Sequence, residues 1–323
     1  MRRTTGFVTM LGLLAVAVSA APGASPTRRL GPPALEGSGM YSLATGADNQ
    51  VYLSWIDTSP DNTATLRFSR LVGGKWTAAA TIATGKDWFV NWADHPSITA
   101  LPNGTLVAHW LVNNPGSIGH GYGIRMAQSD DRGQTWREFF KAGLEHKTDY
   151  SGFVSFLAGA TGVSAVYLTP TPAHGSPGGQ GDAGHGTEHV KSLKIARFGL
   201  DGRLLADVAV DADVCTCCST AMVETADGLV AAYRDHQGPV RDISVVRFRH
   251  GQWTAPATVH RDNWLIDGCP TNGPVLAARD RRVAIARQTT NHTFACPSPE
   301  MPARYSRHPP PSMAASQSVT HRS

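Results

Sequence analysis

Residues 129–136 read SDDRGQTW and match the spacing S-x-D-x-G-x-T-W. In such a string the Asp carboxylate can accept backbone N–H bonds inside a tight turn, the Gly takes a positive φ, and the Trp packs under the next sheet. The side chains expected to build this turn belong to Ser129, Asp131, Gly133, Thr135 and Trp136. The string therefore predicts a structural β-turn that does no chemistry of its own.

The segments around this string recur along the chain. A short strand-like run followed by a turn, and often by a Trp, occurs at residues 66–69, 124–127, 193–196 and 243–246. Two further apolar runs precede each of them, as residues 97–100 and 106–110 do for the second. The repeat period is roughly 55 to 65 residues, a little above the usual value for propellers. This order of strands and turns predicts an all-β chain built as a β-propeller.

The last repeat is incomplete. A fifth repeat begins at residues 273–277 and continues through 282–286, after which the strand pattern stops. Residues from Cys296 onward are rich in Pro, Ser, Arg and His, which do not favour a ladder. Because a propeller closes by joining its last blade to its first, half a blade predicts exposed edges. We favour a chain cut short, by a frameshift after about Arg287 or Thr290, over a disordered tail on a complete domain. A partner chain that fills the gap would also pair with the exposed strand edges.

The first residues predict export. Arg2 and Arg3 precede an apolar run at residues 7–18 and small residues suited to cleavage near Ala20, which is the pattern of a secretory signal. The expected organisation is a signal peptide at 1–20, a disordered leader at 21–36, an incomplete propeller at 37–290 and a disordered or aberrant tail at 291–323. The mature protein is therefore expected to be secreted, periplasmic or extracellular.

Composition excludes two classes of partner. No stretch after the signal is long and apolar enough to span a bilayer. The formal net charge of +4 falls when the signal leaves with its arginines, and no Lys/Arg cluster remains. We therefore expect neither a membrane span nor nucleic-acid binding.

These features together resemble the sialidase (neuraminidase) superfamily, and more closely a secreted bacterial branch of sialidase-like proteins with Asp-box (BNR) repeats. The resemblance covers about residues 37–285. It rests on residues 87–94 (DWFVNWAD), 109–112 (HWLV), 152–155 (GFVS), 214–218 (VCTCC), 233–235 (YRD), 240–243 (VRDI) and 268–274 (GCPTNGP). It implies a six-bladed β-propeller, here truncated within blade five, that acts on or binds glycans.

The propeller architecture predicts where the functional site lies. The first strand of each blade lines the central channel, so residues just before those strands converge at one mouth of the channel. The residues expected there are Asp94, His95, Asp149, Tyr150, Ser151, Cys215, Cys217, Cys218, Cys269 and Asn272. This ring is unusually polar and reactive for a structural channel.

Glycoside hydrolysis is the first functional hypothesis. The resemblance implies a Tyr nucleophile with a carboxylate base, a separate acid, and arginines that hold the substrate carboxylate. The candidate catalytic residues are Asp94, Tyr150, Glu224, Arg234 and Asp235, with Tyr233 as an alternative nucleophile. The candidate substrate-binding residues are His95, Trp92 and Asn272. In the structural alternative, Tyr233 packs in its strand and Arg234 forms an ion pair with Asp235. The chain lacks the Arg-Ile-Pro string near the start in which sialidases place their first arginine.

The cysteines allow a second hypothesis. Cys215, Cys217 and Cys218 lie within one turn, and Cys269 is expected to approach from the neighbouring blade. Thiolates select soft ions such as copper(I) or zinc, and His95 could add a nitrogen ligand. In an exported protein a disulfide between Cys269 and one of the other three is the structural alternative, and a reactive thiol is a third.

A non-catalytic binding module is the third hypothesis. In it the channel mouth binds a glycan or protein partner, with Trp88, Trp92 and Trp110 as stacking surfaces or, alternatively, as blade packing. The Gly-rich insertion at residues 169–192 is expected to form a solvated loop, with metal capture by His174, His185 and His189 as the alternative.

Overall fold

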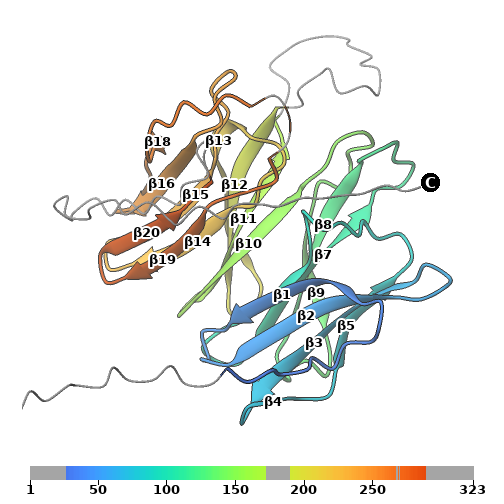
Figure 1. Cartoon of the computed structure of the whole chain (residues 1–323). Helices are drawn as coiled ribbons and strands as arrows, with labels where there is room; N and C mark the ends of the chain where they lie inside the picture. Colours follow the sequence, from blue (N-terminus) through green and yellow to red (C-terminus); the bar gives the residue numbers. More distant parts are fainter. Residues whose placement is uncertain (1–26, 172–189, 267, 269, 289–323) are drawn as a thin grey trace, which may run out of the picture. The chain divides into compact units, whose positions relative to one another are not determined.

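The computed structural model describes residues 27–171, 190–266, 268 and 270–288. The chain divides into a short N-terminal unit, Met1–Gly31, and a second unit, Pro32–Ser323, which holds every described strand. The described residues form β-strands joined by turns and contain no helix (Figure 1). Accordingly, this part of the chain includes no helix that could cross a membrane.

The first two sheets are antiparallel and follow the order of the chain. The strands of the first sheet are β1 (Gly39–Thr45), β2 (Val51–Thr58), β3 (Ala64–Val72) and β4 (Lys75–Trp76), with β5 (Ala80–Gly85) also paired to β3. The strands of the second sheet are β6 (Ser97–Ala100), β7 (Leu106–Asn113), β8 (Tyr122–Ser129) and β9 (Arg137–Ala142).

The remaining sheets repeat this up-and-down order. The third sheet contains β10 (Gly152–Gly159), β11 (Gly162–Pro170), β12 (Lys191–Gly199) and β13 (Leu204–Val214). The fourth contains β14 (Ala221–Thr225), β15 (Gly228–Arg234), β16 (Ile243–Arg249) and β17 (Gln252–Trp253), with β18 (Ala257–Thr258) paired to β16. The last described sheet is the hairpin of β19 (Val275–Arg279) and β20 (Arg282–Ala286).

The first strands of successive sheets are neighbours. β1 contacts β6, β6 contacts β10, β10 contacts β14, and β14 contacts β19. Sequential antiparallel sheets whose first strands adjoin one another are the blades of a propeller. The predicted strand positions and the all-β class are therefore confirmed.

Burial follows each strand's position in its sheet. β7, the second strand of its sheet, is buried along all but its last residue, because neighbouring sheets cover both of its faces. β13 lies at the sheet's outer edge, and all of its residues except the buried Val214 are exposed or half-buried. Position in the blade, more than local composition, therefore decides which strands are apolar throughout.

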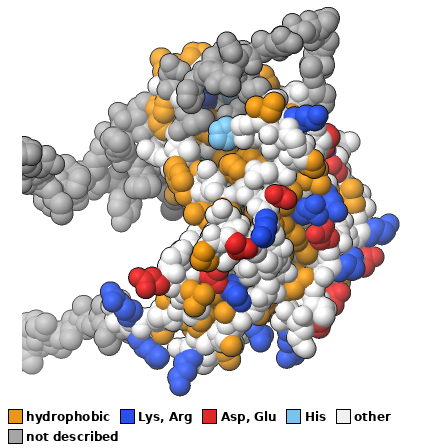
Figure 2. All heavy atoms as spheres, turned by 90° about the vertical axis from the view of Figure 1, so that its right-hand side faces the viewer, with side chains coloured by type: hydrophobic (Ala, Val, Ile, Leu, Met, Phe, Trp, Pro, Cys, Tyr) orange, Lys and Arg blue, Asp and Glu red, His pale blue; other side chains and the backbone are white. Residues whose placement is uncertain are grey.

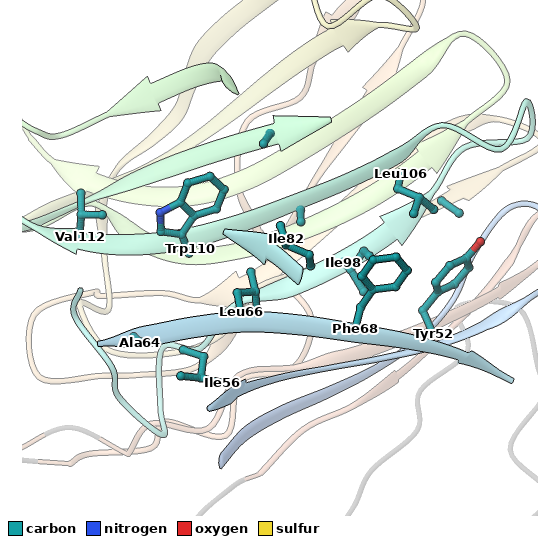
Figure 3. Close-up of a cluster of buried hydrophobic side chains, with 13 residues drawn as sticks. Tyr52, Ile56, Ala64, Leu66, Phe68, Ile82, Ile98, Leu106, Trp110 and Val112 are labelled. Atoms are coloured by element: carbon teal, nitrogen blue, oxygen red, sulfur yellow. The ribbon is translucent and has the colours of Figure 1, made fainter. Parts of the chain in front are cut away.

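The first two sheets pack on a shared apolar core. Leu66 and Phe68 of β3 lie in one buried cluster with Leu106 and Trp110 of β7 (Figure 3). Each side chain of this size that is fully buried contributes roughly 1.5 to 3 kcal/mol. This core holds the second sheet in place and, with it, the segment that carries Asp94.

The turn at residues 129–136 is held by side-chain hydrogen bonds. Oδ1 of Asp131 accepts from the backbone N–H of Thr135 at 2.9 Å and from Ser129 Oγ at 2.7 Å. Gly133 has a φ of 89°. The ring of Trp136 meets Phe68 edge-on, with centroids 6.0 Å apart. Trp136 thus packs against the preceding sheet, where the sequence had suggested the next one, because the turn lies at the end of β8 that faces β3.

Charge is mixed on the surface. On the face drawn in Figure 2, acidic and basic side chains are interspersed among the described residues. The expectations for the signal peptide, the histidines of the insertion, Cys269, Cys296 and the tail at 291–323 all lie outside the described residues.

Candidate functional site

A hollow of about 320 Å³ lies among the first strands of the first four sheets. Hydroxyl groups dominate its polar lining, and Asp94 and His95 are its titratable side chains among the described residues. The full lining is Ser42, Ala93, Asp94, His95, Ser97, Phe153, Val154, Ser155, Phe156, Ser219, Thr220, Ala221 and Met222. The predicted convergence beside the first strands is therefore seen for Asp94 and His95.

Asp94 joins the second sheet to the third. Its side chain is buried, Oδ1 accepts the backbone N–H of Phe153 at 2.8 Å, and Oδ2 accepts the hydroxyl of Tyr122 at 2.9 Å. Gly152 leaves the room for this carboxyl, since a Cβ at that position would overlap Oδ2. The start of β10 and the carboxyl therefore position each other.

Burial raises the pKa of Asp94 to about 7. The hydrogen bonds from Phe153 and Tyr122, and the charge of Lys191, act in the opposite direction but do not outweigh the loss of solvation. A carboxyl with this pKa is partly protonated near neutral pH, so it can both donate and accept a proton there.

An aromatic stack supports this carboxyl. Tyr122 lies between Phe89 and Tyr150, with ring centroids 3.8 Å and 4.7 Å away and nearly parallel planes. Lys191 lies over the Tyr150 ring, 3.6 Å from its centroid, and donates to Asp149 and to the Tyr150 carbonyl. Burial lowers the pKa of Lys191 to about 8, although Asp149 partly offsets the shift.

Tyr150 connects the stack to the cysteine turn. Its hydroxyl donates to the backbone carbonyl of Thr216, between Cys215 and Cys217. This hydroxyl is thus part of the wall between two blades. The structure brings Tyr150 close to Asp94 through Tyr122.

The three described cysteines lie together in the connection from β13 to β14. All are buried, and their sulfur atoms lie within 4.8 Å of one another. The sulfur of Cys215 is 4.0 Å from that of Cys217 and 3.6 Å from that of Cys218, well beyond the ~2.05 Å of a disulfide. The predicted cluster is therefore present as three neighbouring sulfurs.

Hydrogen bonds within this cluster shift the pKa values of Cys215 and Cys218 in opposite directions. The thiols of Cys217 and Cys218 lower the pKa of Cys215 by hydrogen bonding to its sulfur, with a smaller contribution from the charge of Arg241. The pKa of Cys218 is raised, chiefly by its hydrogen bond to Cys215, and the charge of Arg234 opposes that shift. The two shifts are opposite in direction, so Cys215 loses its proton more readily than Cys218.

Arg234 is buried beside this turn. Its guanidinium donates to the backbone carbonyls of Asn272 and Arg241, at 2.8 Å and 2.6 Å, and lies 4.5 Å from the Trp264 ring. Asp235 instead accepts from Ser244 Oγ. The structure brings Arg234 to the backbone carbonyl of Asn272 and directs Asp235 to a different partner, Ser244.

The other candidates lie apart from Asp94. Glu224 is exposed near the end of β14, with Oε2 about 4 Å from where a Cβ of Gly159 would lie, whereas Tyr150 precedes the opposite end of β10. The eight residues of β10 span roughly 26 Å at ~3.3 Å per residue, so Glu224 is not brought to Tyr150. Tyr233 donates to Asp211 at 2.5 Å and packs in the core.

The tryptophans have different environments. Trp88 stacks on Trp110 with ring centroids 5.7 Å apart, and both pack with the core of the first two sheets. Trp92 is 69% exposed and is therefore the one of these three that is open to a ligand.

Tyr122 and Lys191 were missed by the sequence analysis. Both begin strands, β8 and β12, that are the third strands of their blades. The pairing of these strands with β7 and β11 brings Tyr122 to Asp94 and Lys191 to Tyr150. A Lys at the head of an apolar strand, as in KSLKIARF, was the available signal for Lys191.

Comparisons with known proteins give structural similarity only. No family model and no curated protein matches the sequence. The fold is similar to a GH93 α-L-arabinofuranosidase of Fusarium graminearum in complex with arabinobiose (12% identity, 77% of this chain and 74% of that one, TM-score 0.48). It is also similar to an α-L-arabinanase of Penicillium chrysogenum (10% identity, 79% of this chain and 79% of that one, TM-score 0.45). A third similar structure is the Hadza microbial sialidase Hz136 (13% identity, 80% of this chain and 57% of that one, TM-score 0.41).

Proposed function

We propose that this chain is a glycan-acting propeller that cleaves a glycosidic bond in the hollow, with Asp94 as the proton donor. The observation that carries the proposal is the buried carboxyl of Asp94 in the lining of the hollow, where burial raises its pKa to about 7. A general acid is most effective when its pKa lies near the working pH. Protonation of the leaving glycosidic oxygen is the step that needs such a group.

The lining of the hollow suits a sugar. Ser42, Ser97, Ser155 and Thr220 can exchange hydrogen bonds with sugar hydroxyls, and Phe156 offers an apolar face to the C–H groups of a ring. Its volume of about 320 Å³ lies at the low end of the ~300 to 1,000 Å³ of ligand pockets. We therefore expect a small glycan or the terminal residue of a longer one.

His95 is the partner of Asp94 in this proposal. As Asp94 gives its proton to the leaving oxygen, His95 takes a proton from the water that adds to the anomeric carbon. Both groups line the hollow, and an unprotonated imidazole nitrogen can accept a proton.

The narrower hypothesis of an exo-α-sialidase has a specific requirement. Sialic acid carries a carboxylate, which is best held by arginine. No arginine lines the hollow among the described residues, and the Tyr150 hydroxyl is directed at a carbonyl. These observations favour a neutral glycoside as substrate, with a sialoside as the competing case.

The test is a panel of fluorogenic glycosides, one α-sialoside among neutral α-L-arabinofuranosides, glucosides and galactosides, assayed from pH 4 to 9. We expect turnover of a neutral glycoside that falls as the pH rises above about 7, where Asp94 loses its proton. Asp94→Asn should lower kcat by about 100-fold or more.

Asp280→Asn is the matched control. Asp280 is exposed at the β19–β20 turn, and its φ of 55° suits Asn equally well. We expect this variant to retain wild-type rates. Equal loss in both variants, or no turnover of any glycoside, would refute the proposal, and glycan-array binding without turnover would identify a binding module instead.

A further inference from the structure

The cysteine turn offers an arrangement of sulfurs that the glycan-acting site does not use. Three buried sulfur atoms come from four consecutive residues between β13 and β14, all within 4.8 Å of one another. The backbone N–H of Cys215 donates to the carbonyl of Arg234 at 3.1 Å, which ties the turn to the end of β15. The sulfurs are thus held by secondary structure on both sides of the turn.

The spacing of the sulfurs matches that around a bound ion. An ion that holds thiolates at about 2.3 Å keeps the sulfurs about 3.8 Å apart in a tetrahedral site and about 4.0 Å apart in a trigonal one. The separations of 3.6 Å and 4.0 Å from Cys215 lie close to both values. An ion could therefore enter with little movement of the turn.

The surroundings favour a soft ion of low charge. The cysteines are buried in an apolar cluster with Phe153, Leu168 and Val214, which limits the access of water to the sulfurs. A copper(I) ion on three thiolates leaves two negative charges, and the buried guanidinium groups of Arg234 and Arg241 supply two positive ones. Zinc in structural sites takes four ligands, whereas the described residues bring three together here.

We propose that Cys215, Cys217 and Cys218 form a copper(I) site that fixes the connection between the third and fourth blades. Binding forms three copper–sulfur bonds, the protons of those cysteines that are still thiols leave to solvent, and the ion stays in its reduced state. The bound ion restrains the turn between the two sheets, so its removal lowers the melting temperature. The site is independent of hydrolysis at Asp94.

The test is copper loading of the full chain under anaerobic, reducing conditions with a copper(I) chelator as competitor. We expect about one ion per chain, and X-ray absorption that finds three sulfur neighbours at about 2.3 Å. Cys215→Ser, Cys217→Ser and Cys218→Ser should each lose the retained ion. Cys296→Ser is the control and should keep it. The X-ray absorption of the unaltered chain decides the question even where a Ser variant fails to fold.

Four outcomes would overturn the proposal. One is fewer than three sulfur neighbours around the copper in the unaltered chain. Another is copper retained by all three Ser variants. The third is a disulfide that includes one of these cysteines in the purified protein, and the fourth is a bound zinc ion that copper(I) does not displace.

Discussion

Tyr122 donates a hydrogen bond of 2.9 Å to the buried carboxyl of Asp94 while its ring lies between those of Phe89 and Tyr150. One residue thus orients the carboxyl of the second sheet and packs against the segment that leads into the third. Burial raises the pKa of Tyr122, so this hydroxyl keeps its proton at neutral pH and remains a donor.

Tyr122→Phe should destabilise the protein and raise the pKa of Asp94 further. The hydrogen bond from the Tyr122 hydroxyl stabilises the ionised carboxylate of Asp94, so its loss shifts the equilibrium toward the protonated carboxyl. The Phe ring preserves the aromatic stack. We expect a loss of about 1 to 2 kcal/mol in the free energy of unfolding, measured by urea denaturation. Tyr167→Phe is the control: its hydroxyl donates to Asp207 at 2.9 Å, so it should also lose stability but leave the pKa of Asp94 unchanged.

Asp94→Asn should alter the pH dependence of stability. The folded pKa of Asp94 lies above its unfolded value, so the folded state binds more protons between about pH 4 and 7. The contribution of Asp94 to the free energy of unfolding of the wild type is fully present at low pH. It falls as the pH rises through that window, by about 1.4 kcal/mol for each pH unit between the unfolded and folded pKa values. The Asn variant should lack this fall. Identical pH profiles of urea unfolding for the two proteins would contradict the prediction.

Gly133→Ala should cost more stability than Gly104→Ala. Both glycines have a positive φ, 89° and 85°, so the backbone strain is matched. A Cβ at Gly133 would overlap the Phe68 ring, whereas one at Gly104 would meet nothing within 4 Å. We expect Gly104→Ala to lower the free energy of unfolding by about 1 kcal/mol through backbone strain alone, and Gly133→Ala to lower it by about 1 to 3 kcal/mol more. Equal shifts in thermal unfolding would mean that Phe68 does not pack closely on this turn.

Lys191→Met should be far more damaging than Lys194→Met. Lys191 is fully buried against Asp149, and its removal leaves a largely buried carboxylate without that cation. Lys194 pairs with Asp207 at 2.5 Å in a partly exposed setting. We expect a loss of about 3 to 5 kcal/mol for the first variant and about 0 to 1 kcal/mol for the second. Denaturation midpoints that agree within error would disprove the distinction.

Local pattern predicted the strands well because strand identity depends on neighbouring residues. The runs at Val51–Thr58 and Leu106–Asn113 combine β-branched and aromatic residues between turns, and both are strands. The position of Asp94 before β6 was also enough to predict that it lies beside the first strands of the sheets. Both inferences needed only the order of strands in a blade.

Contacts between distant strands could not be predicted in this way. The partners of Asp94 lie 28 and 59 residues away, at Tyr122 and Phe153, and depend on the exact register of β7 with β8 and on how two sheets meet. The partner of Trp136 depends likewise on which sheet faces the end of β8. Such contacts arise from packing that no single segment encodes.

The most direct measurement is the titration of the Asp94 carboxyl by carbon-13 NMR, with Asp94→Asn to assign the resonance. The account predicts a midpoint near pH 7, since burial outweighs the hydrogen bonds that the carboxyl accepts. A midpoint near 4, the ordinary value of an exposed Asp, would contradict it. Asp94 would then be ionised at neutral pH, so it would only hold two sheets together by hydrogen bonds and could not be the proton donor of the hollow.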